Sequence, residues 1–247
     1  MRLPTIYSEE LPAVDVLAVA AHPDDVEQTC GGTLIKMAEK GYRTAVLDLT
    51  AGEMGTRGTP ERRLEEADAA GRVLLLKWRG NMAFPDARIE NALPARFTLA
   101  GEIRRLRPRV LIAPYWEGRH PDHYNSSRLC YESCFLAGLA KIDDTLAPHR
   151  PYKIIYASQY ANVTPSFVVD ISAQFERRMQ SLFAYQSQYG DSPEGSHLFP
   201  PQSEVRERLA SVARFYGNLI GVKYGEPFVV KEAQMVDDIV AMGVRSI

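Results

Sequence analysis

Two short clusters of histidine and aspartate in this chain have the residue types and the spacing of a metal site. His22 and Asp25 belong to the stretch AHPDD, and His120 and His123 belong to the later stretch HPDH. Two side chains that are three residues apart can point to one centre if they lie in a turn. One histidine of the second pair, added to the first pair, gives the two imidazoles and one carboxylate of a catalytic zinc site, with one position left for water. The spacing alone does not decide which histidine that is.

Asp24 directly precedes Asp25 and offers a carboxylate that need not bind the metal. Zinc lowers the pKa of its bound water to about 7, so a neighbouring carboxylate can accept that proton near neutral pH. The simpler interpretation is that Asp and Pro after a strand only cap and open a helix. Two clusters of the same kind favour the metal site over capping.

The glycine-rich stretch GEMGTRG, residues 52–58, is the next candidate for a binding role. It does not match the dinucleotide fingerprint, which counts against a Rossmann dehydrogenase, and it lacks the lysine of a phosphate-binding loop. We expect Glu53 and Arg57 to lie over the pocket, with Arg57 ready for a carboxylate or a hydroxyl-rich ligand. The alternative is a flexible turn without a binding role.

Strand-like apolar runs alternate with segments of helical periodicity, and these elements must position the clusters. The predicted strands are 14–21, 44–50, 109–114, 153–158 and 167–171. The predicted helices are 26–40, the segment that Pro60 opens, 95–108, 124–141, 172–187 and 203–217. This order predicts a Rossmann-like α/β fold with a mostly parallel β-sheet and helices on both faces. Both clusters then follow the carboxyl ends of strands, where such sheets bind ligands.

The composition fits one globular domain over residues 1–247, with a flexible Gly-, Pro- and Ser-rich loop at about 189–204. The net charge of −2, from 29 basic and 31 acidic residues, gives no reason to expect nucleic acid or a membrane as a partner. Three cysteines are too few for a disulfide framework, and the N-terminal residues lack the apolar core of a signal peptide. We therefore expect a cytoplasmic protein.

Several of these stretches resemble the PIG-L/LmbE family of zinc-dependent N-acetylglucosamine deacetylases. The resemblance is carried by AHPDD at 21–25 and HPDH at 120–123. GEMGTRGTPERRLEEA at 52–67 and LIGVKYGEPF at 219–228 are similar to the branch that works in bacillithiol biosynthesis. That branch removes the acetyl group from N-acetylglucosaminyl L-malate.

The resemblance implies a role for each residue of the two clusters. It assigns His22, Asp25 and His123 to zinc, and it assigns Asp24 as the general base. It gives His120 the role of a positively charged partner of the oxyanion or the leaving group. Fe²⁺ and Co²⁺ compete with Zn²⁺ for such donors, so the resemblance leaves the working metal open.

The resemblance also implies a partner and a place for the remaining candidates. It places Arg57, and less firmly Glu53, around a small-molecule N-acetylglucosaminyl substrate, and it puts His197 at the pocket mouth. It further suggests a homo-oligomer, with a hexamer as one form. Two alternatives are the same hydrolysis on another N-acyl sugar or thiol conjugate, and a non-catalytic sugar-binding α/β module.

Overall fold

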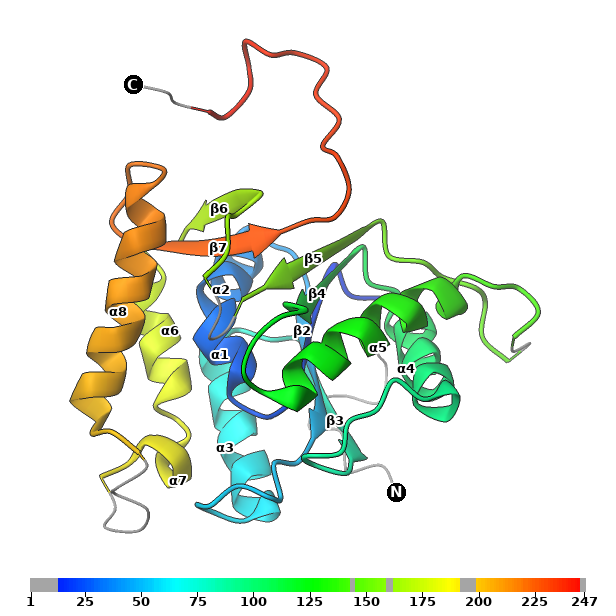
Figure 1. The fold of residues 1–247 in the computed structure, drawn as a ribbon, viewed down its shortest axis with the longest axis horizontal. Coiled ribbons are helices and arrows are strands. Elements are labelled where there is room, and N and C mark those ends of the chain that lie inside the picture. Colours follow the sequence, from blue (N-terminus) through cyan, green and yellow to red (C-terminus); the bar gives the residue numbers. More distant parts are fainter. Residues whose placement is uncertain (1–12, 143–144, 159–161, 192–198, 245–247) are drawn as a thin grey trace.

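The computed structural model describes residues 13–142, 145–158, 162–191 and 199–244, and these contain a seven-stranded sheet in the order β3-β2-β1-β4-β5-β7-β6 (Figure 1). Strands β1 to β5 pair in parallel, whereas β7 runs antiparallel to both β5 and β6. The prediction of a mostly parallel sheet is therefore confirmed. The strands are β1 (Val16–Ala20), β2 (Thr44–Thr50), β3 (Trp78–Phe84), β4 (Val110–Pro114), β5 (Lys153–Ala157), β6 (Phe167–Asp170) and β7 (Gly225–Val229).

Helices cover both faces of this sheet, as the sequence predicts. On one face lie α4 (Leu93–Leu106) and α5 (Pro121–Ala137), which bury Leu99 and Leu129 against Leu111 of β4. On the other face lie α1 (Asp25–Thr29) and α2 (Gly31–Glu39), whose Val26 and Leu34 pack in one apolar cluster with Val46 of β2, and α3 (Pro60–Val73). Three further helices, α6 (Phe175–Leu182), α7 (Gln186–Tyr189) and α8 (Gln202–Asn218), lie beyond α1, α2 and α3 (Figure 1).

Three features of the fold differ from the sequence-based expectations. Strands β3 and β7 are missing from the predicted set, because WRGNMAF carries polar residues and Gly80, and GEPFV carries Pro227. The predicted helix 26–40 is two helices that break at Cys30, and the predicted helix 172–187 is the pair α6 and α7. The helix expected from 124 begins at Pro121, so HPDH lies in the first turn of α5.

The chain between α7 and α8 holds the loop that we expected at 189–204. Its residues 192–198, including His197, lie outside the described residues. In the part of the chain that the structure describes, no helix combines the length and the apolar character needed to cross a membrane.

Candidate metal centre

The turn after β1 holds the first cluster in an unusual backbone conformation. Asp24 has φ 104°, in the left-handed region that few residues other than glycine adopt. This conformation lets α1 start at Asp25, whose Oδ2 accepts a hydrogen bond from the His22 backbone N–H over 2.9 Å. Both carboxylates and the imidazole are buried. The turn is therefore closed by one of its own carboxylates.

The second cluster is held by the start of α5. Pro121 occupies the first turn of the helix, and His120 is the N-cap, a position that Ser, Thr, Asp and Asn usually fill. His120 Nδ1 accepts a hydrogen bond from the Asp122 backbone N–H over 3.3 Å. The other ring nitrogen of His120, Nε2, then carries the hydrogen whenever the ring is neutral.

The structure brings the two clusters together. The imidazole of His22 lies 4.8 Å from that of His120 and 5.4 Å from that of His123, between ring centroids. Asp25 Oδ2 lies 3.4 Å from His22 Nδ1 and 3.3 Å from His123 Nε2. Ligands at zinc bond lengths of about 2.0–2.1 Å in a tetrahedron are separated by roughly 3.3–3.4 Å. The distances from Asp25 Oδ2 to the two imidazole nitrogens therefore match the spacing of ligands around a zinc-sized cation.

The far nitrogen of His22 faces two carboxylates that the sequence analysis missed. His22 Nε2 lies 3.0 Å from Asp86 Oδ1 and 3.2 Å from Asp122 Oδ2. Backbone N–H groups of Ala87 and Ile89 donate to the two oxygens of Asp122 over 2.8 and 3.2 Å. A histidine that binds a metal usually donates its other N–H to such a carboxylate, which fixes the ring. These contacts therefore direct Nδ1 of His22 toward Asp25.

A signal for both missed carboxylates is present in the sequence. Pro and Asp follow the end of three strands, as Pro23-Asp24, Pro85-Asp86 and Pro121-Asp122. Asp86 could not be recognised as a residue at the end of a strand, because β3 was not predicted.

Among the described residues, two groups of three have donor atoms that lie within 4.8 Å of one another, and both groups contain His22. One group adds His120 and His123, and the other adds Asp86 and Asp122. Geometry therefore places His120 near the centre as well. The contact with Asp25 separates the two candidates, because it is made by His123 Nε2.

Electrostatics at this centre favour a cation. Burial disfavours a charged His22, but hydrogen bonds with Asp122, Asp25 and Asp86 outweigh burial and raise the pKa of His22 to about 12. Burial would raise the pKa of Asp25, yet His123 and His22 hold it well below its usual range. Burial and the neighbouring His22 and His123 lower the pKa of His120. The carboxylates thus stabilise positive charge at His22, while His120 tends to be neutral.

Asp24 is held by two residues that are distant in the sequence. Its Oδ2 accepts a hydrogen bond from the Tyr189 hydroxyl over 2.8 Å, and its Oδ1 lies 3.7 Å from Arg63 Nη2. Burial, with help from Asp25, raises the pKa of Asp24 to about 7, although Arg63 and Tyr189 act in the opposite direction. A carboxylate with this pKa can accept and release a proton near neutral pH.

Arg63, which the sequence analysis did not single out, ties the glycine-rich loop to the first cluster. Its guanidinium donates to the carbonyls of Pro23 and Gly52 over 2.6 and 3.2 Å. Gly52 has φ +70°, and a Cβ there would lie 2.0 Å from Arg63 Nη1. Only glycine therefore fits at this approach. The pattern ERRLEEA gives no hint that its second arginine is buried.

The two residues that we expected to contact the substrate, Glu53 and Arg57, differ in burial. Glu53 is exposed, and its Oε1 accepts a hydrogen bond from the Asp86 N–H over 2.7 Å, which links it to the centre. Arg57 is buried, donates to the Gln188 carbonyl over 3.2 Å and lies 4.5 Å above the Phe199 ring. Arg57 thus joins the glycine-rich loop to the chain around α7.

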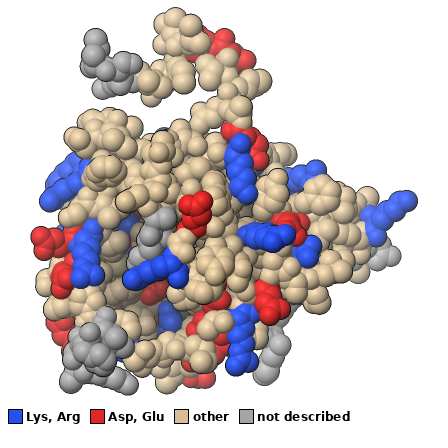
Figure 2. Space-filling view, in the orientation of Figure 1, with Lys and Arg blue, Asp and Glu red and all other residues tan. Residues whose placement is uncertain are grey.

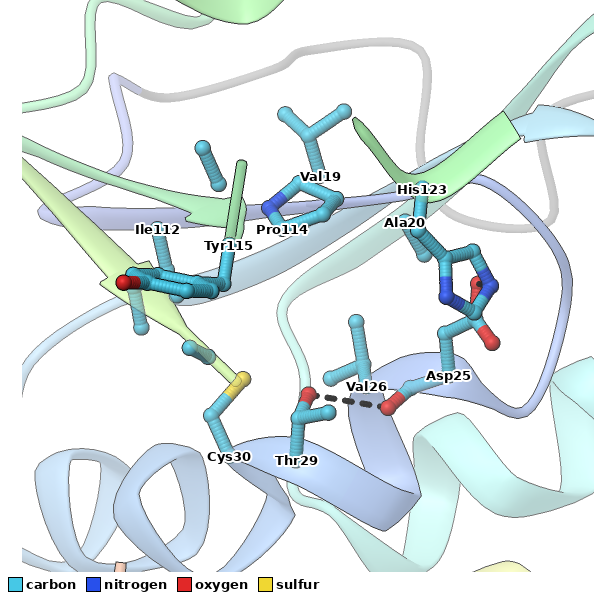
Figure 3. Close-up of a pocket in the computed structure, with 12 residues that line it drawn as sticks. Val19, Ala20, Asp25, Val26, Thr29, Cys30, Ile112, Pro114, Tyr115 and His123 are labelled. Atoms are coloured by element: carbon cyan, nitrogen blue, oxygen red, sulfur yellow. Dashed lines mark hydrogen bonds and ion pairs between the residues drawn. The ribbon is translucent and has the colours of Figure 1, made fainter. Parts of the chain in front are cut away.

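A small apolar pocket opens beside the ligands (Figure 3). Asp25 and His123 lie at one end, and Cys30 and Tyr115 lie at the other. The rest of the wall comes from the ends of β1, β4 and β5 and from α1. The pocket therefore has a polar, ionisable end and an apolar end.

The sequence is similar to known deacetylases. Residues 17–134 match the family model described as PIG-L, GlcNAc-PI de-N-acetylase. The chain is 30% identical over 225 residues to diacetylchitobiose deacetylase of Thermococcus kodakarensis, covering 85% of this chain and 80% of the relative. It is 27% identical over 195 residues to a probable N-acetyl-alpha-D-glucosaminyl L-malate deacetylase 2 of Bacillus anthracis, covering 70% of this chain and 81% of the relative.

The same fold is found among solved structures. The crystal structure of the conserved protein TT1542 from Thermus thermophilus superposes with a TM-score of 0.82 at 40% identity, covering 91% of this chain and 98% of the other.

Proposed function

Since the chain belongs to the PIG-L/LmbE family of deacetylases, we propose that it is a metal-dependent hydrolase that removes the N-acetyl group from an N-acetylglucosaminyl conjugate. The observation that carries this proposal is the convergence of His22 Nδ1, Asp25 Oδ2 and His123 Nε2. Asp24, a carboxylate with a raised pKa, lies next to them.

We assign His22, Asp25 and His123 as the metal ligands, and Zn²⁺ as the ion that this nitrogen and oxygen set suits best. A bound divalent metal supplies Lewis acidity to the amide carbonyl and to the attacking water. Asp24 accepts the proton that the water loses as it attacks. The same carboxyl returns that proton to the departing amine, so that acetate and a free glucosamine leave.

We assign His120 a neutral form in place of the positively charged one that the resemblance implies. Its Nδ1 is engaged with the Asp122 N–H, and its pKa is lowered, so a neutral ring with hydrogen on Nε2 is favoured. We assign this N–H as a donor to the carbonyl oxygen as negative charge develops there. A neutral donor replaces the positively charged partner that we expected from the sequence.

Two further features indicate which acyl group the substrate carries and what is attached to its sugar. The apolar pocket beside Asp25 and His123 suits the methyl group of an acetyl. Arg57 is a buried cation whose partners include a carbonyl oxygen and an aromatic face, so a substrate carboxylate would complement it. We therefore assign N-acetylglucosaminyl L-malate, the substrate in the name of one relative, ahead of diacetylchitobiose, the substrate in the name of another.

We place this activity in the cytoplasm. Cys30, Cys130 and Cys134 are free and buried, which suits a reducing compartment.

The test is acetate release from both substrates, with and without a chelator. We expect turnover that a chelator abolishes and added Zn²⁺ restores, with the higher kcat/KM on the malate conjugate. Arg57→Met should reduce kcat/KM about 10–100-fold more for the malate conjugate than for diacetylchitobiose, which is what one lost charge-assisted contact costs. Arg72→Met, at an exposed arginine of α3, is the control.

Two results would reject parts of this proposal. Faster turnover of diacetylchitobiose, with equal effects of Arg57→Met on both substrates, would assign a neutral sugar in place of the malate conjugate. If the protein binds sugar but contains no metal and releases no acetate, it is a non-catalytic sugar-binding module.

A further inference from the structure

Residues 231–244, which we call the tail, leave the body of the protein after β7 and carry apolar side chains into solvent. All of them are exposed, with Met235, Ile239 and Val240 at 87%, 82% and 91%. Figure 1 shows the tail arching clear of the sheet and helices, and Figure 2 shows it as a mostly uncharged arm with one acidic stretch. An apolar arm of this kind is unfavourable in water unless something covers it.

The root of the tail is fixed to the body. Lys231 Nζ lies 4.9, 4.6 and 5.0 Å from the ring centroids of Trp116, Tyr131 and Tyr156. An ammonium group is attracted to the faces of aromatic rings, so these three contacts hold the start of the tail against the body. The tail therefore starts from a defined point beside α5 and β5.

A wide groove, which we call the β5–α5 groove, lies next to this root and also has exposed apolar walls. Phe135 of α5 is 55% exposed and Tyr152, directly before β5, is 77% exposed. Arg150 and Lys153 add exposed cations to the same groove. Residues 232–235 of the tail line one side of it, and the tail then leads away.

We propose that the tail of one copy of this chain lies in the β5–α5 groove of a second copy. The two surfaces match in chemistry. Along the tail, the apolar pairs 235–236 and 239–240 flank Asp237 and Asp238. In the groove, aromatic walls stand beside two cations. Apolar side chains then meet apolar walls, and the two carboxylates meet Arg150 and Lys153.

A second copy fits this exchange better than the chain's own groove. Within one chain, residues 232–235 of the tail already line this groove, and Ile239 and Val240, which do not line it, follow farther along the tail. Each copy carries both a tail and a groove, so two copies can exchange tails about a twofold axis and leave neither unfilled. This inference does not depend on the proposed deacetylase activity.

The first test is the mass of the full chain in solution, measured by light scattering or sedimentation. The wild-type chain should have a mass of at least twice 27.6 kDa. The double substitution Ile239→Asp with Val240→Asp should lower that mass at least twofold, and so should Tyr152→Asp in the groove. Ser203→Asp adds a charge at an exposed residue of α8, outside the tail and the groove, and should leave the mass unchanged. A monomeric wild type, or an unchanged mass in the double variant, would overturn the proposal.

The second test identifies the occupant of the groove by a disulfide trap. Native cysteines will not interfere, because Cys30, Cys130 and Cys134 are buried. Two chains of different tagged mass, one with Val240→Cys and the other with Tyr152→Cys, are mixed and oxidised. A covalent pair of mixed mass is expected. If the pair is absent, or if both substitutions in one chain give only an internal disulfide, the tail does not enter a partner's groove. Binding of a monomeric chain to phospholipid vesicles through the tail would also overturn the proposal.

Discussion

Tyr189 donates a hydrogen bond to Asp24 Oδ2 over 2.8 Å, although 165 residues separate them in the sequence. The contact joins the end of α7 to the strained turn after β1. Glu66 of α3 fixes the helix that carries Tyr189. Its carboxylate accepts hydrogen bonds from the N–H and the hydroxyl of Ser187 in α7 over 2.8 and 2.6 Å. Glu66 is buried, although it lies in the highly charged stretch ERRLEEAD.

Tyr189→Phe should move the acid limb of the pH profile of kcat/KM to higher pH. The hydroxyl lowers the pKa of Asp24, so its removal raises that pKa. A general base works when it is deprotonated, and its activity is therefore lost as pH falls through its pKa. Profiles of both proteins between about pH 5 and 9 measure the shift. If the acid limb stays in place or moves to lower pH, Asp24 is not the group that accepts the proton.

Asp24→Asn should retain the metal and lose about 10²–10⁴-fold in kcat, the usual effect of losing a general base. Asn is chosen because it tolerates the left-handed backbone of this residue better than Ala. Asp25→Asn is the matched comparison, and it should lose the metal. Metal content of the purified proteins, together with kcat, checks both. Metal loss in the Asp24 variant would mean that the two carboxylates have exchanged roles.

His123→Ala should empty the site, whereas His120→Ala should keep the metal and lower kcat. The reason is that His123 Nε2 lies 3.3 Å from Asp25 Oδ2, while His120 Nδ1 caps α5. Metal analysis after dialysis against a weak chelator decides between them. The opposite pattern would assign His120 as the third ligand, in line with its place among the three clustered imidazoles.

Asp122→Asn should weaken metal binding about 10–100-fold without removing a ligand, because Asp122 orients the His22 ring. Titration against a competing chelator gives the affinity. Glu65→Gln, at an exposed residue of α3, is the control and should have no effect. Equal affinities for the wild type and the Asp122 variant would show that His22 is oriented by other contacts.

Arg79→Met should destabilise the fold by about 3–5 kcal/mol, the usual cost of breaking a buried ion pair by removing one partner. The guanidinium is fully buried and lies 2.6 Å from Glu27 Oε1 and 2.8 Å from Asp48 Oδ2, so its loss leaves two carboxylates without their cation. Denaturant unfolding measures the change. Arg206→Met removes an exposed partner of Glu176 and should cost at most about 1 kcal/mol. Similar losses in both would contradict the buried role.

The order of strands and helices could be predicted from sequence wherever apolar periodicity was uninterrupted, as in β1, β2 and β4. The prediction missed β3 and β7, because Arg79 and Pro227 interrupt the apolar pattern of these two strands. Pairing with neighbouring strands makes both segments β-strands in spite of their composition. The break at Cys30 between α1 and α2 also left no compositional signal.

The candidate site shows the same division. Side chains at the ends of predicted strands could be placed together from the topology of a parallel sheet, which is why both histidine clusters were found. Asp86 follows an unpredicted strand, and Tyr189 reaches the site from α7, so sequence spacing carried no information about either.

The central claim is that one divalent cation is held by residues from the ends of β1 and β4. Crystals of the zinc-loaded protein, with anomalous scattering recorded at the zinc edge, test this claim most directly. We predict one ion at about 2.0–2.2 Å from His22 Nδ1, Asp25 and His123 Nε2, with Asp24 outside the coordination sphere. An ion bound by Asp86 and Asp122, an ion bound by His120 in place of His123, or no ion at this position would contradict the account.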